Sequence, residues 1–236
     1  MSAHGTELAH FRDRHVTKSA VMSKAGEEGP KAPGEISRGG ACVPVGLLGG
    51  TFDPPHVGHV ALAERAIDAL ALDRLLVVVV GEAPHKPVET PAEIRFRLAE
   101  AAFGGLQHVE LSRRELDRPG PSFTVDTARW AALELDDPVF IVGADEFADF
   151  PRWREPDEIL AHVRLAVATR PGIDRERLDA VRHGLAHPER VNDFDLEPVP
   201  VSSRDIRARV AEGEPIDGLV PPAVARLIAA EGLYRV

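Results

Sequence analysis

The sequence lacks several features that define particular classes of protein. It contains one cysteine, Cys42, in 236 residues, so no internal disulfide framework can form, and no base stands beside this thiol to activate it. No apolar run approaches the roughly 18 residues that a membrane-spanning helix needs. Lys and Arg number 28 against 38 Asp and Glu, and the net charge of −10 argues against the basic face of a nucleic-acid-binding protein. We therefore expect a cytoplasmic protein that binds neither membranes nor nucleic acids.

The composition divides the chain into two parts. Residues 1–43 are rich in Gly, Lys, Glu, Ser and Ala and show no apolar periodicity, so we expect a disordered N-terminal extension. Residues 44–236 carry the apolar pattern of a folded domain. The overall content of 44% hydrophobic and 28% charged residues is ordinary for a globular protein. The sequence leaves the oligomeric state open, a homo-oligomer included.

From residue 44 onward, short apolar runs alternate with longer segments of helical periodicity. This alternation predicts an α/β fold, a doubly wound parallel sheet, whose ligand lies at the carboxyl ends of the strands. The expected strands are 45–48, 75–80, 109–111, 139–142 and 165–168, with a further short strand at 199–201. The expected helices are 60–72, 91–103, 124–135 and 175–184, followed by a small C-terminal helical portion at 203–212 and 221–231.

The stretch GGTFDPPHVGH, residues 49–59, is the most informative segment of the chain. Its paired glycines end a strand, and a helix begins near Gly58, so the unpaired N–H groups and positive dipole end of that helix favour an anion. His56 and His59 add hydrogen-bond donors at the same place. The segment alone is compatible with three interpretations: a phosphate site, half of a zinc site, and a structural helix cap.

Other polar loops follow the expected strands, and a parallel sheet would bring them to one edge. Lys86 lies in such a loop, and with Arg207 it could focus positive charge on a small polyphosphate, although a lone lysine is usually only a surface residue. Asp145 could accept hydrogen bonds from ribose or cap the next helix. Trp153 could stack on a ligand or pack against the protein.

The motifs, taken in order, resemble a known family. GGTFDPPHVGH, PHK at 84–86 and SSRDIR at 202–207 are similar to the nucleotidyltransferase superfamily with an HxGH turn and a late serine-rich segment. Within it, PSFTVDT at 121–127, GADEF at 143–147, FPRW at 150–153 and TRPG at 169–172 resemble bacterial nicotinate-nucleotide adenylyltransferase. The resemblance runs from residue 45 to the terminal EGLY at 231–234.

The resemblance implies a Rossmann-like nucleotidyltransferase fold and adenylyl transfer from ATP to nicotinate mononucleotide, giving deamido-NAD and pyrophosphate in NAD biosynthesis. It implies that Mg²⁺ accompanies ATP, held by phosphates and water, with no metal site on the protein. The residues it assigns to the phosphates are His56, His59, Lys86 and Arg207. Those it assigns to nucleotide binding are Gly49, Gly50, Thr51, Phe52 and Gly58 in the first loop, Ser202 and Ser203 near the end, Asp145 at a ribose, and Thr124 and Trp153 at the nicotinate.

One departure from the family pattern concerns the late segment. The family has serine, serine and threonine there, whereas Arg204 replaces the threonine, so a hydroxyl is lost and a charge is gained. Three alternatives to the leading hypothesis stay open. They are the same chemistry on nicotinamide mononucleotide or phosphopantetheine, a metallohydrolase with ligands from His56, His59, His85 and Asp53, and a nucleotide-binding module without turnover.

Overall fold

The apolar runs form strands and the periodic segments form helices in the order that the sequence predicts. The computed structural model describes residues 44–84 and 87–235. Its strands are β1 (Val45–Gly50), β2 (Arg74–Val79), β3 (Val109–Ser112), β4 (Pro138–Gly143), β5 (Arg164–Thr169) and β6 (Val191–Asp195). Its helices are α1 (Val57–Leu70), α2 (Ala92–Phe103), α3 (Thr124–Glu134), α4 (Ala144–Ala148), α5 (Pro156–His162), α6 (Arg175–His183), α7 (Ser203–Glu212) and α8 (Pro222–Glu231), with 3₁₀ turns η1 (Phe150–Arg152) and η2 (Pro188–Arg190).

The six strands form one parallel sheet in the order β3-β2-β1-β4-β5-β6. The chain runs outward from β1 through β2 to β3, then returns to the other side of β1 and continues through β4 to β6. The strand order therefore reverses between β1 and β4, and in doubly wound sheets a ligand crevice opens outside the carboxyl ends at such a point. The predicted fold class is confirmed.

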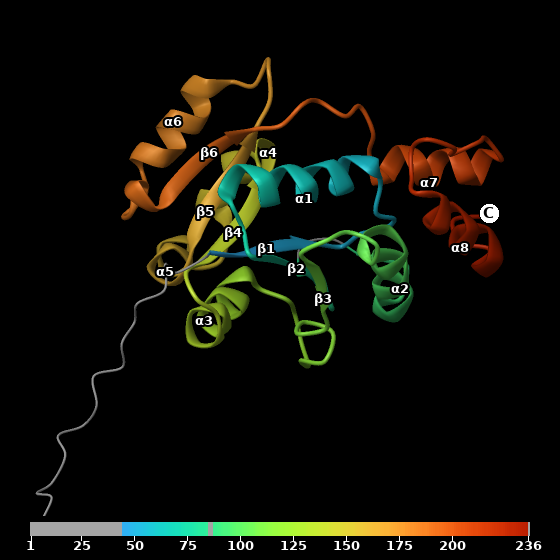
Figure 1. Cartoon of the computed structure of the whole chain (residues 1–236), viewed down its shortest axis with the longest axis horizontal. Helices are drawn as coiled ribbons and strands as arrows, with labels where there is room; N and C mark the ends of the chain where they lie inside the picture. The colour runs from blue at the N-terminus through green and yellow to red at the C-terminus, as the bar shows by residue number, and fades with distance from the viewer. Residues whose placement is uncertain (1–43, 85–86, 236) are drawn as a thin grey trace, which may run out of the picture. The chain divides into compact units, whose positions relative to one another are not determined.

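Both faces of the sheet are covered by helices (Figure 1). Successive side chains of a strand point to opposite faces. Leu47 of β1 and Phe140 of β4 accordingly join the core with α3 and α5. Their neighbours Leu48 and Ile141 join the core with α1 and α2. Burial on both faces explains why these strands appear in the sequence as continuous apolar runs.

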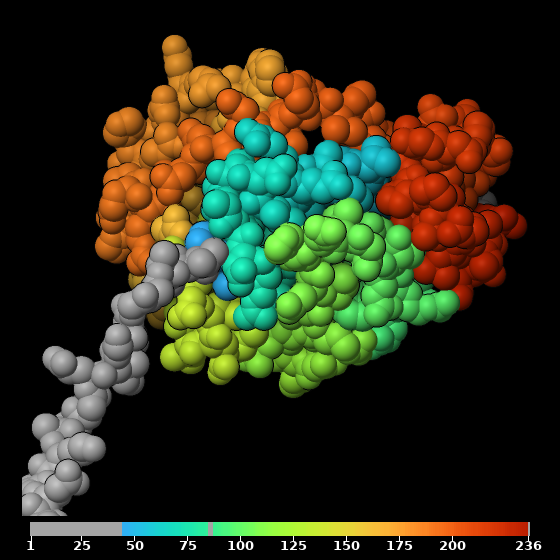
Figure 2. Space-filling view, in the orientation of Figure 1, coloured from blue at the N-terminus to red at the C-terminus, as the bar shows by residue number. Residues whose placement is uncertain are grey.

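The last two helices form a smaller core against α2. Ile206 of α7 and Val224 and Ile228 of α8 are buried together with Leu98 of α2. Figure 2 shows this C-terminal segment, in red, lying against the green segment that includes α2. The expected C-terminal helical portion is thereby confirmed, including the start of α7 after its serine cap at Ser202.

The expected strand at 199–201 is wrong. The sixth strand is β6, which pairs with β5 and was not predicted because only Val191 and Phe194 of its five residues are buried, so the segment shows no apolar run. The short helices α4 and α5 were also missed. In the described part of the chain, no helix is both long enough and apolar enough to cross a membrane. The expected extension at 1–43 and Lys86 lie outside the described residues.

Candidate active site

The loop after β1 folds tightly because of its glycines. A Cβ atom on Gly50 would lie 2.8 Å from the ring of Phe52, and one on Gly49 would lie 3.1 Å from Phe140. Phe52 itself has a left-handed backbone, with φ of 48°. Its ring is 1% exposed and packs edge-on against His59, with centroids 5.2 Å apart. Phe52 therefore packs against His59 inside the protein, and its assignment to nucleotide binding stays a prediction.

His56 and His59 form a stacked pair at the start of α1. Their ring centroids are 3.7 Å apart, and the backbone N–H of His56 donates to Nδ1 of His59 at 3.1 Å. Because Nδ1 of His59 accepts this bond, the neutral ring carries its proton on Nε2 and presents an N–H donor there. Gly58 leaves room beside this pair, since a Cβ atom at that position would lie 3.0 Å from Nδ1 of His56 and would press on the ring.

His56 is neutral at physiological pH. Burial lowers its pKa from the ordinary 6.5 to about 4, because the charged ring is poorly solvated. Its Nδ1 is buried and has no hydrogen-bond partner among the described residues. His56 is therefore a neutral side chain at the cleft, and positive potential there comes from the start of α1.

This lowered pKa leads to a prediction about stability. Unfolded His56 titrates near pH 6.5, whereas the folded ring stays neutral to about pH 4, so between these values the unfolded state binds the extra proton. The free energy of unfolding should fall as pH falls through that window, and His56→Asn should flatten the fall. Urea unfolding of both proteins at pH 7, 6 and 5 measures this. Parallel curves would show that His56 has the same pKa in both states.

The C-terminal part of the chain holds the loop that leads into α1. Ser203 donates its hydroxyl to the carbonyl oxygen of Pro54 at 2.8 Å, and Nη1 of Arg207 donates to the carbonyl oxygen of Asp53 at 2.6 Å. The Asp53 carboxylate accepts from the hydroxyl of Tyr234 at 2.7 Å. Burial and this carboxylate raise the pKa of Tyr234, which stays protonated. Residues 149 to 181 positions apart in the sequence thus fix one loop.

Ser202 has a different role from Ser203 in the structure. Its hydroxyl accepts from the backbone N–H of Asp205 at 3.1 Å, and so caps α7. Arg204, which replaces the family's threonine, is exposed on the first turn of the same helix.

Arg95 of α2 is a residue that the sequence analysis missed. It is 2% exposed, and its guanidinium donates to the carbonyl oxygens of four residues at 2.6 to 3.0 Å: Thr51, Val80, Gly81 and Thr90. Burial lowers its pKa, although the group stays charged. Arg95 therefore ties the loop after β1 to the loop after β2.

A signal for Arg95 was present in the sequence. It precedes Leu98 and Ala99 by three and four residues, and both are fully buried, so the arginine occupies the apolar face of its helix. A charged residue at such a position is almost never fully buried unless it is paired.

A cleft of about 210 Å³ opens at the carboxyl ends of β4 and β5, beside the start of α1. Its lining includes four of the expected site residues: His56, Gly58, His59 and Asp145. Asp145 forms an ion pair with Arg170 at 3.1 Å. Arg170 was missed, although its place directly after β5 was a signal, because ligand-binding residues follow strand ends in this fold. The remaining lining residues are Leu62, Gly143, Ala144, Glu146, Ala168, Leu196, Glu197, Pro198 and Val199.

The other expected residues lie elsewhere in the described structure. Thr124 begins α3 after the end of β3, and Trp153 follows η1 after the end of β4. Trp153 is half-buried and packs on Phe150, with ring centroids 5.3 Å apart, and it borders the core on the α3 side of the sheet. None of the following lines the cleft: Gly49, Gly50, Thr51, Phe52, Thr124, Trp153, Ser202, Ser203 and Arg207.

The metal-site alternative finds little support. Among residues 44–84 and 87–235, no group of three His, Cys, Asp or Glu side chains could hold a metal ion. Nδ1 of His59 and the carboxylate of Asp53 are already occupied by hydrogen bonds within the protein. His85, the remaining ligand of that hypothesis, lies outside the described residues.

Comparison with known proteins identifies the family. Residues 47–209 match the cytidylyltransferase-like family model. The chain is 44% identical to a probable nicotinate-nucleotide adenylyltransferase of Roseiflexus sp. (strain RS-1), over 81% of this chain and 98% of that protein. It is 40% identical to one of Thermus thermophilus, over 81% of this chain and 99% of that protein.

A solved structure shares the fold. Nicotinic acid mononucleotide adenylyltransferase of Plasmodium falciparum, complexed with NaAD, is 16% identical and superposes with a TM-score of 0.65, over 81% of this chain and 97% of that one. The sequence relatives, the family model and the geometry at the start of α1 agree, and the chain belongs to the nicotinate-nucleotide adenylyltransferase family of cytidylyltransferase-like proteins.

Proposed function

We propose that this protein transfers the adenylyl group of ATP to nicotinate mononucleotide, giving deamido-NAD and pyrophosphate in NAD biosynthesis. The observation that carries the proposal is the stacked pair of His56 and His59 at the start of α1, beside the crevice of a doubly wound sheet, in a chain of this family. A helix start with added N–H donors is suited to bind phosphate.

The reaction needs no nucleophile from the protein. A phosphate oxygen of the mononucleotide forms the new bond to the α-phosphorus of ATP. The bond from that phosphorus to the oxygen bridging to the β-phosphorus breaks, and pyrophosphate leaves with the electron pair. The protein then contributes by aligning two nucleotides and by stabilising charge on the transferring group.

Individual residues can be assigned to these tasks. His59 donates from Nε2 to the α-phosphate, and neutral His56 hydrogen-bonds to the phosphates beside it. Arg207 is held at the loop by its bond to Asp53 and supplies positive charge to the phosphates, with Lys86 as a second cation. Asp145, in the cleft with the histidines, binds a ribose hydroxyl.

We further propose that ATP enters as its magnesium complex. Mg²⁺ keeps most of its water and is held mainly by substrate phosphates in sites of this kind, where it neutralises their charge.

The acceptor side of the proposal rests on Thr124 and Trp153. Trp153→Ala should raise the KM for the mononucleotide about fivefold, because a stacked aromatic pair contributes about 1 kcal/mol, and should change the KM for ATP less. Trp130→Ala is the matched control, since that indole lies on α3 against Arg114. Steady-state kinetics with each substrate varied in turn would measure both. Equal effects of Trp153→Ala on the two KM values would indicate general loop damage.

Pyrophosphate release from ATP with a panel of acceptors tests the function itself. The panel comprises nicotinate mononucleotide, nicotinamide mononucleotide and phosphopantetheine at matched concentrations. We expect fastest turnover with the first. A preference for the amide would overturn the acceptor assignment but keep the reaction type. ATP binding without pyrophosphate release for any acceptor would indicate a binding module.

A further inference from the structure

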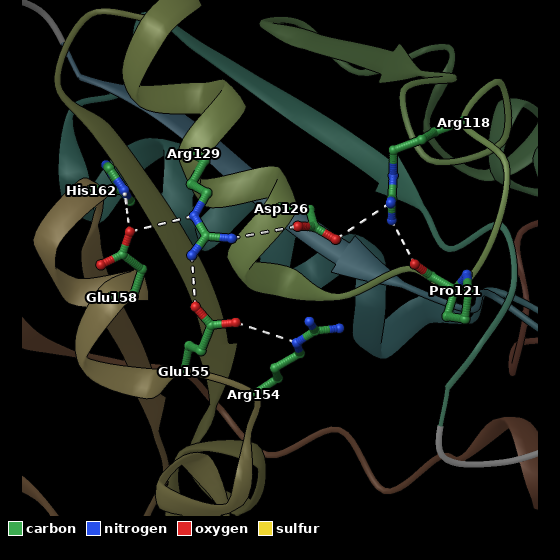
Figure 3. Close-up of polar contacts among 8 residues, drawn as sticks. All are labelled: Arg118, Pro121, Asp126, Arg129, Arg154, Glu155, Glu158 and His162. Atoms are coloured by element: carbon green, nitrogen blue, oxygen red, sulfur yellow. Dashed lines mark hydrogen bonds and ion pairs between the residues drawn. The ribbon is translucent and has the colours of Figure 1, made fainter.

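A network of charged side chains lies outside the cleft and connects α3 with the segment that leads into α5 (Figure 3). Its centre is Arg129 of α3. The guanidinium of Arg129 lies 2.6 Å from the Glu155 carboxylate, 3.4 Å from that of Glu158 and 3.7 Å from that of Asp126. A planar guanidinium suits this role because it can serve several carboxylates from different directions.

The network extends in two directions from Arg129. On α5, Nε2 of His162 lies 3.0 Å from the carboxylate of Glu158. On the other side, Arg118 contacts Asp126 at 3.3 Å and donates to the carbonyl oxygen of Pro121 at 2.6 Å. The network therefore reaches the loop that precedes Thr124, one of the two segments assigned to the acceptor.

The other acceptor segment is attached to the same network. Trp153 is followed directly by Arg154 and Glu155, and the Glu155 carboxylate accepts from both Arg154 and Arg129. The guanidinium of Arg154 also lies over the ring of Phe123, 4.5 Å from its centroid. Arg154, next to Trp153, is thus attached to Phe123, next to Thr124, by a cation–π contact, and the ion pair of Glu155 with Arg129 attaches the same segment to α3.

The backbone at Glu155 is one that side chains rarely adopt. Its φ of 54° and ψ of 57° are left-handed, and this residue turns the extended chain at Trp153 into α5, which begins at Pro156. This conformation is strained for a non-glycine residue, because it places Cβ too close to the following carbonyl oxygen. The carboxylate of Glu155 is bound to Arg129 at 2.6 Å, so the network opposes relaxation of this turn.

We propose that Arg129 is a positioning residue for the acceptor site, which holds Trp153 at the place where the pyridine ring of the mononucleotide stacks. This inference rests on the proposed function. The side chains of Arg129, Glu155 and Glu158 are 41 to 43% exposed, and exposed pairs contribute little to global stability. These ion pairs instead restrict the conformational freedom of the two acceptor segments. A loop that is already ordered loses less conformational entropy when the mononucleotide binds.

Arg129→Met tests the inference, since it keeps most of the apolar stem and removes the charge. We expect the KM for nicotinate mononucleotide to rise about threefold, with kcat and the KM for ATP changed less than twofold and the urea midpoint nearly unchanged. Arg164→Met is the matched control: Arg164 also pairs with an exposed carboxylate, that of Asp137, but at the amino end of β5. We expect this control to leave both KM values unchanged.

A double variant makes the test specific to Trp153. If Arg129 acts through the indole, Arg129→Met should raise the acceptor KM in the wild-type background and have no further effect in the Trp153→Ala background. Additive effects, or equal rises in both KM values, would overturn the inference while the proposed function stands. A wild-type protein that forms no deamido-NAD from ATP and nicotinate mononucleotide would overturn both.

Discussion

Turnover should fall by roughly 100-fold when His59 is replaced by alanine, with pyrophosphate release at saturating substrates as the measurement. The reason is the orientation of this ring. Nδ1 accepts from the backbone of His56, so Nε2 carries the proton that can bond to charge developing on the α-phosphate. Loss of a donor aimed at such charge typically has an effect of this size.

Two further substitutions separate donation from helix capping. His59→Gln keeps a donor near the position of Nε2, whereas His59→Asn keeps an acceptor near Nδ1 and lacks the distal donor. We expect Gln to retain more activity than Asn. His108→Ala is the control, because its ring bonds to the carbonyl oxygen of Asp73, at the amino end of the sheet. If His59→Ala left the turnover unchanged, the ring of His59 would serve only to cap α1.

The second large effect concerns Arg95. Arg95→Met should lower the free energy of unfolding by about 3–5 kcal/mol, because four carbonyl oxygens lose a charged donor in a buried place. Turnover should fall by roughly 10-fold or more even where the protein is fully folded. The substitution removes the hydrogen bond to the carbonyl oxygen of Thr51, in the loop that leads to the histidines. A small displacement of such a loop can lower turnover by this factor.

Arg97→Met provides the matched control for Arg95. It lies on the same helix and pairs with Glu231 at 2.8 Å, with 48% of its side chain exposed, so we expect a change below about 1 kcal/mol. Arg95→Lys should be intermediate, because an ammonium cannot reach four acceptors in the fork geometry of a guanidinium. Urea denaturation of the three variants measures these changes, with the midpoints compared at an unchanged m-value. Equal decreases in the free energy of unfolding for Arg95→Met and Arg97→Met would contradict the role of Arg95 as a buried link between the two loops.

Much of the fold could be predicted because strands buried on both faces appear as apolar runs. β6 shows the limit of that signal. It lies at the edge of the sheet, only Val191 and Phe194 of it are buried, and its other residues are polar. Its pairing with β5 makes it a strand, and such pairing between distant segments leaves no local pattern in the sequence.

The candidate site could be predicted in part for the same reason. His56, His59 and Asp145 follow strand ends and do line one cleft. The burial of the Phe52 ring against His59 could not be predicted, because it depends on a left-handed backbone that the residue type does not suggest. Ser202 and Ser203 are neighbours with different partners, one on its own helix and one on the loop at Pro54.

By itself, the order of residues along this chain determined a parallel α/β sheet, a helix start that carries two histidines after the first strand, and the motifs of the family. Those properties are local, since each depends on periodicity, on glycine and helix-start chemistry, or on adjacent residues. Only the tertiary structure decided that Arg95 and Tyr234 hold the loop of the histidines and that Arg129 of α3 pairs with Glu155 at the start of α5. Hydrogen bonds and ion pairs form between groups that folding brings within about 3 Å, and separation along the sequence does not encode that distance.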